Sequence, residues 1–214
     1  MILDPQKIEL ESMRIIQDTI GEYSCPPENL PVVKRVIHAT ADFDFLKTLY
    51  FSEGAVMKAR EALLKHTPII TDTLMLTSGI TKKYGLKIVC HVSDDDVISE
   101  AKSRNITRAI VNIERSVNDY PDAIYAIGNA PTALIRLCEL IKEGKALPAL
   151  VSGVPVGFVN VIESKNMLAS LTDVPRIIAH GNKGGTTVAC AIINAIIYSI
   201  SVSKSQGMNT LPLK

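Results

Sequence analysis

Residues 123–134 decide the fold class. They read Ala-Ile-Tyr-Ala-Ile-Gly-Asn-Ala-Pro-Thr-Ala-Leu, so five apolar residues end at Gly128 and a proline stands where a helix would begin. A short, continuous apolar run is typical of a strand that is buried on both faces. Proline is tolerated in the first turn of a helix because the N–H there has no partner within the helix. The stretch therefore predicts a buried strand followed directly by a helix.

The same alternation of strand and helix extends in both directions. Apolar runs predict further strands at residues 68–71, 86–92, 149–152 and 176–179, and helical patterns cover residues 94–103, 107–116, 132–143, 159–170 and 185–201. Such alternation implies right-handed crossovers and an α/β fold with a doubly wound, mainly parallel sheet of about five strands. An N-terminal helical segment precedes the sheet, with helices over residues 4–20, from about Pro31 to His38, and over 52–65 with Ser52 as the cap.

The length and composition are those of an ordinary globular enzyme. The chain has 214 residues, of which 47% are hydrophobic and 21% charged, so it can bury a sizeable core by itself. We expect residues 1–214 to form a single domain, with residues 203–214 as a loose polar tail. The formal net charge is +1, so no global field recruits nucleic acid or an anionic membrane.

The cysteines and apolar segments favour a cytoplasmic protein. Cys25, Cys90, Cys138 and Cys190 are scattered, without a CxxC pair, which is typical of free thiols in a reducing compartment. The N-terminus does not have the pattern of a signal peptide. The longest apolar stretch, residues 188–202, is too short and too interrupted by polar residues to cross a bilayer.

Polar and glycine-rich residues follow every predicted strand. These segments are residues 71–73, 93–96, 128–132, 153–157 and 180–187. In open parallel sheets the carboxyl ends of the strands and the N-termini of helices meet at one edge, where ligands bind. The sequence therefore predicts a large ligand stretched across this edge.

Several residues at this edge have both a structural and a functional interpretation. Arg35 and His38 are three residues apart and share a helix face, although a histidine at a helix end is also stabilised by the helix dipole. Asn129 or Thr132 either caps the following helix or binds ligand. The acidic run 94–96 is better explained by helix capping than by a metal site, and Arg108 and Arg115 share a face that is solvated by default.

The segment His180-Gly-Asn-Lys-Gly-Gly-Thr-Thr187 opens the last predicted helix. Its glycines permit a close backbone approach, and its N–H groups suit a carboxylate or a phosphate. It matches neither GxxxxGK[ST] nor GxGxxG, so a phosphate-binding role has little support from the sequence.

Taken together, ordered segments along nearly the whole chain resemble the precorrin-8X and cobalt-precorrin-8 methylmutase family. The matching segments are residues 8–12, 35–42, 71–73, 128–134, 153–159 with 163–165, and 181–185. Thr186 stands where serine is usual, which keeps the hydroxyl, and residues 81–93 match only loosely. The resemblance implies a flavodoxin-like sheet and a homodimer, with His38 as the active-site histidine and Ser12 and Arg35 in contact with substrate.

The reaction implied by the resemblance moves a methyl group from C-11 to C-12 of a corrin precursor, formally a 1,5-sigmatropic shift. It needs no cofactor or metal from the protein, because any cobalt belongs to the substrate. His38 is suited to give or take the proton of a ring nitrogen near neutrality. The substrate is a polycarboxylate, for which we expect further anchors at Thr73, Arg108, Asn129, Thr132, Gly184, Gly185 and Thr186.

Two other functions remain open at the level of sequence. A non-catalytic tetrapyrrole carrier would need the same carboxylate anchors but not His38. A nucleotide-binding flavodoxin-like module would use residues 180–187 and bind ATP or a flavin. The sequence does not distinguish a cobalt-containing substrate from a metal-free one.

Overall fold

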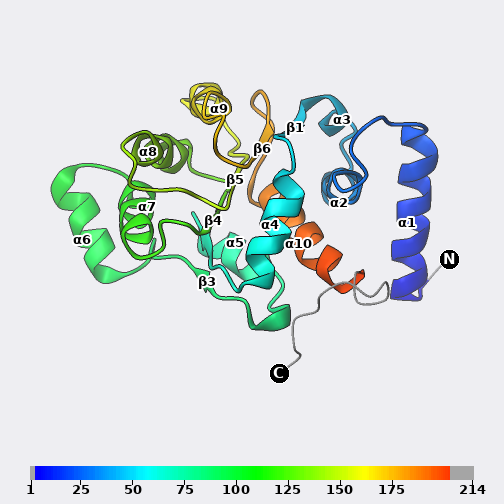
Figure 1. Cartoon of the computed structure of the whole chain (residues 1–214), viewed down its shortest axis with the longest axis horizontal. Helices are drawn as coiled ribbons and strands as arrows, with labels where there is room; N and C mark the ends of the chain where they lie inside the picture. The colour runs from blue at the N-terminus through cyan, green and yellow to red at the C-terminus, as the bar shows by residue number, and fades with distance from the viewer. Residues whose placement is uncertain (1–2, 203–214) are drawn as a thin grey trace.

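Six strands form one sheet in the order β1-β6-β5-β4-β2-β3 (Figure 1). The architecture is taken from a computed structural model that describes residues 3–202, so the tail expected at residues 203–214 lies outside the described residues. The strands are β1 Leu49–Phe51, β2 Ile69–Thr71, β3 Ile88–Val89, β4 Ile124–Ile127, β5 Leu150–Gly153 and β6 Arg176–Ala179.

The five parallel strands confirm the flavodoxin-like prediction. Strand β2 pairs in parallel with both β3 and β4, and β5 and β6 then follow in chain order. This is the order 2-1-3-4-5 of flavodoxin-like sheets. The direction of winding reverses between β2 and β4, and ligands bind at such a switch point.

Strand β1 corrects the expected number of about five strands. It pairs antiparallel with β6, with Leu49 opposite Ala179 and Phe51 opposite Ile177. Three residues are too few to show a period, and antiparallel edge strands are common on otherwise parallel sheets. The Ser52 hydroxyl accepts the Arg176 N–H at 2.9 Å beside this pair, so the prediction that Ser52 caps the next helix was wrong.

Ten α-helices surround the sheet in the described residues, two of which the sequence did not predict. The unpredicted helices, α3 and α5, have four and six residues, too few for a helical period to be recognised. The helices are α1 Pro5–Ile20, α2 Leu30–Thr40, α3 Phe45–Thr48, α4 Ala55–Leu64, α5 Leu74–Gly79, α6 Asp95–Arg104, α7 Arg108–Asp119, α8 Pro131–Lys142, α9 Val161–Ala169 and α10 Thr186–Val202. Within residues 3–202, none of them is both long and apolar enough to span a bilayer.

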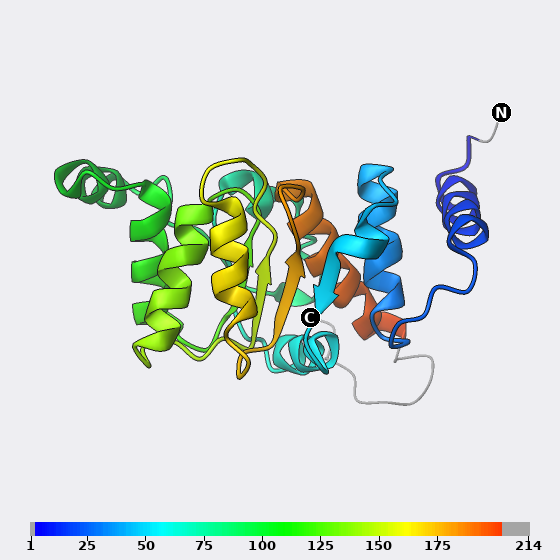
Figure 2. The ribbon, with the colours of Figure 1, turned by 90° about the horizontal axis from the view of Figure 1, so that it is seen from above.

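The sheet separates two apolar layers. On β4, Ile124 and Ala126 face the layer that contains α2, α4, α5 and α10, whereas Tyr125 and Ile127 face the layer with α7, α8 and α9. Figures 1 and 2 show these helices on opposite faces of the sheet, with α1 and α6 at the two ends of the molecule. Successive side chains of β4 are thus buried on opposite faces of the sheet, as a doubly wound arrangement requires.

A buried carboxylate joins the two strands at the switch point. Asp72, directly after β2, is 1% exposed and accepts the N–H groups of Gly128, Asn129 and Ala130 at 3.3, 2.7 and 2.7 Å. Burial raises the pKa of the Asp72 carboxyl, although these three hydrogen bonds favour the ionised form. Asp72 therefore fixes the turn that leads from β4 into α8.

A buried ammonium holds the loop after β6. Lys165 on α9 is 1% exposed, and its Nζ donates to the carbonyl oxygens of Gly181 and Lys183 at 2.6 and 2.8 Å. Burial lowers the pKa of Lys165 to about 8. The side chain has no carboxylate partner within residues 3–202, so the two carbonyls alone compensate its desolvation.

Replacing Asp72 by alanine is expected to lower the free energy of unfolding by about 1–3 kcal/mol, because one buried and two partly buried N–H groups lose their acceptor. Urea unfolding of the purified protein measures this change. Asp122→Asn, at an exposed acid before β4, is the matched control and should stay within about 0.5 kcal/mol of wild type. Equal stability of Asp72→Ala and wild type would contradict the assigned role.

Lys165 should make stability rise with pH above about 8. The folded state loses the Lys165 proton near pH 8, whereas the unfolded side chain keeps it up to about 10.5, so unfolding takes up a proton between these values. The contribution is at most about 1.4 kcal/mol per pH unit. Urea unfolding at pH 7, 8, 9 and 10 should show this rise in wild type and not in Lys165→Met. Parallel curves for the two proteins would contradict it.

Candidate functional site

Two cavities open beside α5 near the carboxyl ends of the parallel strands. The histidine cavity has a volume of about 370 Å³ and lies between α2, α5 and α10. The arginine cavity has a volume of about 430 Å³ and is formed by the loops after β2, β3 and β4 and the start of α7. Leu74 of α5 lines the arginine cavity and Met75 lines the histidine cavity, so the first turn of α5 separates them.

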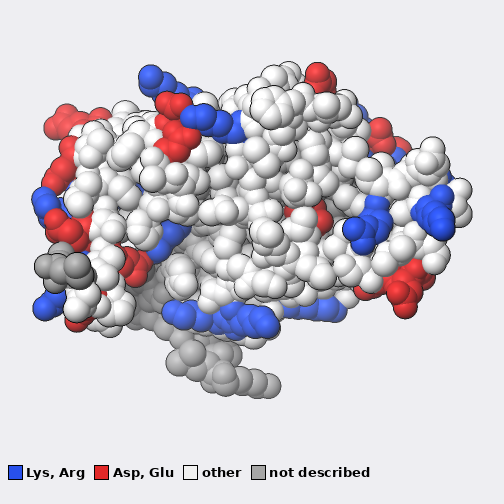
Figure 3. All heavy atoms as spheres, turned by 180° about the vertical axis from the view of Figure 1, so that it is seen from behind, with Lys and Arg blue, Asp and Glu red and all other residues white. Residues whose placement is uncertain are grey.

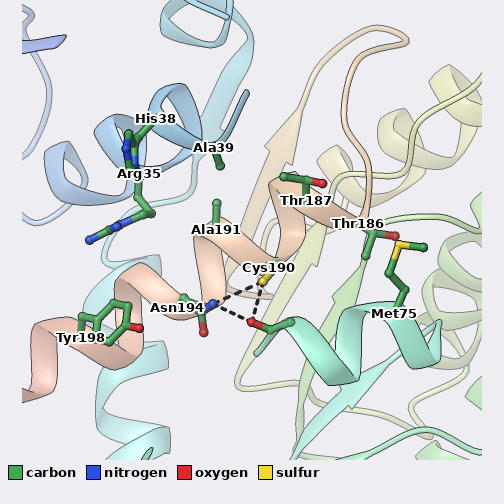
Figure 4. A pocket seen from close by; sticks show the side chains of 11 residues that line it. Arg35, His38, Ala39, Met75, Thr186, Thr187, Cys190, Ala191, Asn194 and Tyr198 are labelled. Atoms are coloured by element: carbon green, nitrogen blue, oxygen red, sulfur yellow. Dashed lines mark hydrogen bonds between the residues drawn. The ribbon is translucent and has the colours of Figure 1, made fainter. Parts of the chain in front are cut away.

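The histidine cavity brings together the predicted catalytic group and two predicted anchors. Figure 4 shows Arg35 and His38 on α2 across from α10, whose first residue, Thr186, also lines the cavity. The opposite face of α2 is buried through Val33, Val36 and Ile37. The predicted three-residue spacing of Arg35 and His38 is thus what brings both side chains to the cavity.

An ion-pair cluster ties the end of α2 to the loop after β6. Lys183 Nζ contacts the carboxylates of Asp42 at 2.8 Å and Asp44 at 2.5 Å. The hydrogen bond from Lys183 holds the pKa of the Asp42 carboxyl below its usual value. Because His38 precedes Asp42 by four residues and Thr186 follows Lys183 by three, this contact fixes the two sides of the cavity relative to each other.

The Arg35 guanidinium lies at the border of the same cavity. One of its nitrogens donates to Glu9 of α1 at 2.8 Å, and its central carbon lies 5.6 Å from the centre of the Tyr198 ring. Figure 4 shows the guanidinium directed towards this ring. The arginine is therefore held in place before any ligand binds, which lowers the conformational cost of binding an anion.

Side chains of α10 hold α5 at the other side of the histidine cavity. Asn194 donates to the Gly79 carbonyl at 2.9 Å and accepts the Thr81 N–H at 2.8 Å, and the Cys190 thiol donates to the same carbonyl at 3.0 Å. Burial raises the pKa of Cys190, so its thiol stays protonated at neutral pH. A neutral thiol is a poor nucleophile. These residues shape the cavity and give no sign of covalent chemistry.

The arginine cavity collects four of the predicted anchors. Thr73, Arg108, Asn129 and Thr132 all line it. Thr73 also caps α5 by accepting the Leu76 N–H at 3.1 Å, and the hydroxyls of Thr107 and Thr132 lie 3.0 Å apart. Arg108 is exposed and makes no ion pair within residues 3–202. Its charge is therefore available to an anionic ligand.

Two helix starts differ from the sequence interpretation. Neither Asn129 nor Thr132 caps α8, because its N-cap is Ala130 and Asp72 takes the N–H groups of the turn. Asp94 does stand at the N-cap of α6, with Asp95 and Asp96 in the first turn as expected, but the Asp94 side chain makes no cap hydrogen bond. Asp94 contacts His91 at 2.7 Å and Asp96 contacts Arg115 at 2.6 Å, so Arg115 is paired rather than merely solvated. The described residues contain no cluster of metal-ligand side chains.

The three remaining predicted anchors, Ser12, Gly184 and Gly185, line neither cavity. Ser12 on α1 lines neither cavity, and its hydroxyl donates to the Ile8 carbonyl at 2.8 Å. The Gly185 N–H donates to the Val154 carbonyl at 2.8 Å, which removes it as a donor to ligand in this structure. Gly184 has φ of 158°, and a Cβ there would lie 2.2 Å from the Val154 oxygen, so only glycine fits.

Sequence reasoning missed several residues that organise the site. Asp72, Lys165 and Lys183 act through contacts with distant segments, which no local pattern reveals. Met75 and Tyr198 line the histidine cavity but stand in apolar stretches typical of a core. Only Asp72 could have been recognised from the sequence, because it directly follows a buried strand, where a carboxylate needs hydrogen-bond partners.

Comparisons with known proteins agree on one family. The model of the family described as precorrin-8X methylmutase matches residues 7–199. A cobalt-precorrin-8 methylmutase of Priestia megaterium is 42% identical over 200 residues, which are 92% of this chain and 88% of the relative. The relative of the same name from Leptospira interrogans is also 42% identical, over 90% of this chain and 92% of its own.

A solved structure supports the same grouping. The crystal structure of precorrin-8x methyl mutase from Thermus thermophilus is similar with a TM-score of 0.86 and 37% identity, over 96% of this chain and 99% of that one. Both the family match and these identities extend over the sheet, the helices and the two cavities. The chain therefore belongs to the precorrin-8X methylmutase family.

Proposed function

We propose that this protein is an isomerase of cobalamin biosynthesis that moves a methyl group from C-11 to C-12 of precorrin-8X or cobalt-precorrin-8. The product is hydrogenobyrinate or cobyrinate. The observation that carries the proposal is that His38 and Arg35 line one cavity at the strand-end edge, beside a second cavity with four further anchors, in a chain of this family.

In the proposed mechanism His38 moves a proton at a ring nitrogen next to the migrating methyl. The shift reorganises the conjugated bonds of the macrocycle, so the protonation state of that nitrogen affects the barrier. The His38 imidazole is exposed and makes no hydrogen bond or ion pair with residues 3–202, which leaves both ring nitrogens open to substrate. Positioned acid–base catalysis contributes about 10²–10⁴-fold, and fixing the ring geometry supplies the rest.

The shape and charge of the surface suit a flat polycarboxylate. Strands β5 and β6 point towards the face seen in Figure 3, whose middle is largely uncharged (Figures 2 and 3). Lys and Arg side chains occur on this face singly and as a band along its lower border. A macrocycle with an apolar ring and peripheral acids matches a neutral surface with separated cations.

The carboxylates of the substrate have distinct partners in the proposal. Arg35 holds one at the histidine cavity, and Arg108 holds another at the arginine cavity, with Thr73, Asn129 and Thr132 beside it. Thr186 and Gly184 border the ring from the loop after β6. Ser12 and Gly185 remain proposed contacts, and binding through them requires their present hydrogen bonds to rearrange. The proposed reaction uses no cofactor or metal from the protein.

A nucleotide-binding function finds less support. The N–H groups at the switch-point turn, where a flavodoxin-like sheet would bind phosphate, already donate to Asp72. The Gly185 N–H of the other candidate loop donates to Val154. A non-catalytic tetrapyrrole carrier shares every anchor with the proposed enzyme and differs only in not requiring His38.

The proposal includes a homodimer in the cytoplasm. Exposed apolar side chains on α1 support a partner surface, since Leu10 is 70% and Ile15 51% exposed. All four cysteines are unpaired, which agrees with a reducing compartment. Light scattering of the purified protein at micromolar concentration tests the oligomeric state.

His38→Ala is expected to lower kcat by about 10²–10⁴-fold while binding of the macrocycle stays largely intact, because only proton transfer is removed. The change is followed by the absorption spectrum of the precursor during turnover. His66→Asn is the matched control, since His66 lines neither cavity and asparagine tolerates its φ of 59°. Wild-type turnover by His38→Ala would rule out the catalytic role of His38. Binding of the macrocycle by wild type without turnover would leave the carrier as the better interpretation.

Arg35→Ala is expected to raise KM by about 10-fold or more, because a charge-assisted contact to a carboxylate is lost. Titration of the protein with macrocycle, followed by absorbance, gives the affinity directly. Glu9→Gln separates binding from structure, since it removes the partner of Arg35 but keeps the arginine. We expect Glu9→Gln to bind as well as wild type. Equal weakening in both variants would mean that Arg35 acts through its contact with α1.

A further inference from the structure

Two cations share one aromatic ring at the border of the histidine cavity. The Lys83 Nζ lies 4.9 Å and the Arg35 central guanidinium carbon 5.6 Å from the centre of the Tyr198 ring. Tyr198 itself lines the cavity. Both distances are within the range in which a cation is attracted by the negative face of a ring. No motif in the sequence marks Lys83 or Tyr198 as functional.

The backbone that carries Lys83 is held close to the cavity. Lys83 begins a short 3₁₀ turn, Lys83–Gly85, that follows α5. Asn194 of α10 fixes the chain just before it, through the Gly79 carbonyl and the Thr81 N–H. Asn194 is one helical turn before Tyr198, so the same helix positions both the turn and the ring. The placement of Lys83 is therefore built into the packing of α10 against α5.

The two cations differ in how far their charge is already compensated. Arg35 is paired with Glu9 at 2.8 Å, whereas Lys83 makes no ion pair with any carboxylate within residues 3–202. Two like charges near one ring repel each other, and the ring compensates this only in part, with about 0.5–1 kcal/mol for each cation at an exposed site. An anion that binds near both cations relieves the repulsion. The arrangement is thus more favourable with a carboxylate bound than without one.

We propose that Lys83, held by Tyr198, is a further substrate anchor that binds a peripheral carboxylate of the macrocycle at the mouth of the histidine cavity. This inference rests on the proposed function and extends it to a residue in the segment 81–93, which resembles the family pattern only loosely. Lys83 is exposed, so it recognises the carboxylate by charge. Arg35 and Lys83 then select a substrate with an acidic edge over a neutral one.

The test is a charge series at one position. Hydrogenobyrinate, the proposed product, is titrated into wild type, Lys83→Arg, Lys83→Met and Lys83→Glu, and the dissociation constant is read from absorbance. We expect Lys83→Arg to bind like wild type, Lys83→Met to bind about threefold to tenfold more weakly, and Lys83→Glu to bind more weakly still. In turnover the change should appear in KM more than in kcat.

The neighbouring Lys82 supplies the matched control. It is exposed on the same segment but, unlike Lys83, is not placed over the Tyr198 ring, so Lys82→Met and Lys82→Glu should leave the dissociation constant within twofold of wild type. The difference between wild type and Lys83→Met should also shrink at 1 M salt, where the screening length is about 3 Å. Equal losses in the Lys82 and Lys83 series would show a general surface-charge effect and overturn the inference.

A second pair of variants tests the role of the ring. In the Tyr198→Leu background, Lys83→Met should cost less affinity than it does in wild type, because the lysine is no longer held. An unchanged cost would overturn the contribution of Tyr198. If wild type binds hydrogenobyrinate and no Lys83 variant changes the affinity, the role of Lys83 as an anchor is overturned, but the proposed function is not. Failure of wild type to bind hydrogenobyrinate would overturn the proposed function as well.

Discussion

The contact between Asp72 and the turn after β4 is the constraint on which the edge of the sheet depends. A carboxylate that is 1% exposed accepts three consecutive N–H groups and so joins the strands at the switch point. The same N–H groups would otherwise form an anion site of the kind that flavodoxin-like folds use for phosphate. Because Asp72 occupies these N–H groups, the proposed partners of external carboxylates are side chains, such as Arg108 in the same cavity.

The fold was predictable wherever burial leaves a continuous apolar run. The strands after residue 68 and their helices were anticipated within a few residues, because strands buried on both faces carry few polar side chains. Strand β3 covers only Ile88–Val89, whereas a strand was predicted over residues 86–92, and β1, α3 and α5 were not predicted. These elements have two to six residues, and their stability comes from partners far along the chain, as in the pairing of Leu49 with Ala179.

The residues that line the two cavities could be predicted from their side-chain types and positions in the sequence. The contacts that hold the loops in place could not. Arg35, His38 and Thr186 do meet at one cavity, because α2 packs against α10. Thr73, Arg108, Asn129 and Thr132 meet at the other, because strand-end loops of a parallel sheet converge. The prediction that Asn129 or Thr132 caps α8 was wrong, because the neighbouring sequence does not reveal that Asp72, after another strand, accepts the N–H groups of this turn. Ser12 shows the same limit, because its hydroxyl is taken up by its own helix.

The charged residues fall into two groups with different roles, according to whether other groups of the protein compensate their charge. Lys165 and Asp72 are buried and bonded to backbone groups, so they fix loops. Lys183 joins α2 to the loop after β6 through two carboxylates. Arg108 and Lys83 make no ion pair within residues 3–202. Arg108 lines the arginine cavity, and Lys83 lies over the Tyr198 ring, which lines the histidine cavity. The buried charges thus hold the edge of the sheet in place, and the uncompensated charges face solvent there. Such preorganisation lowers the cost of binding the proposed polycarboxylate.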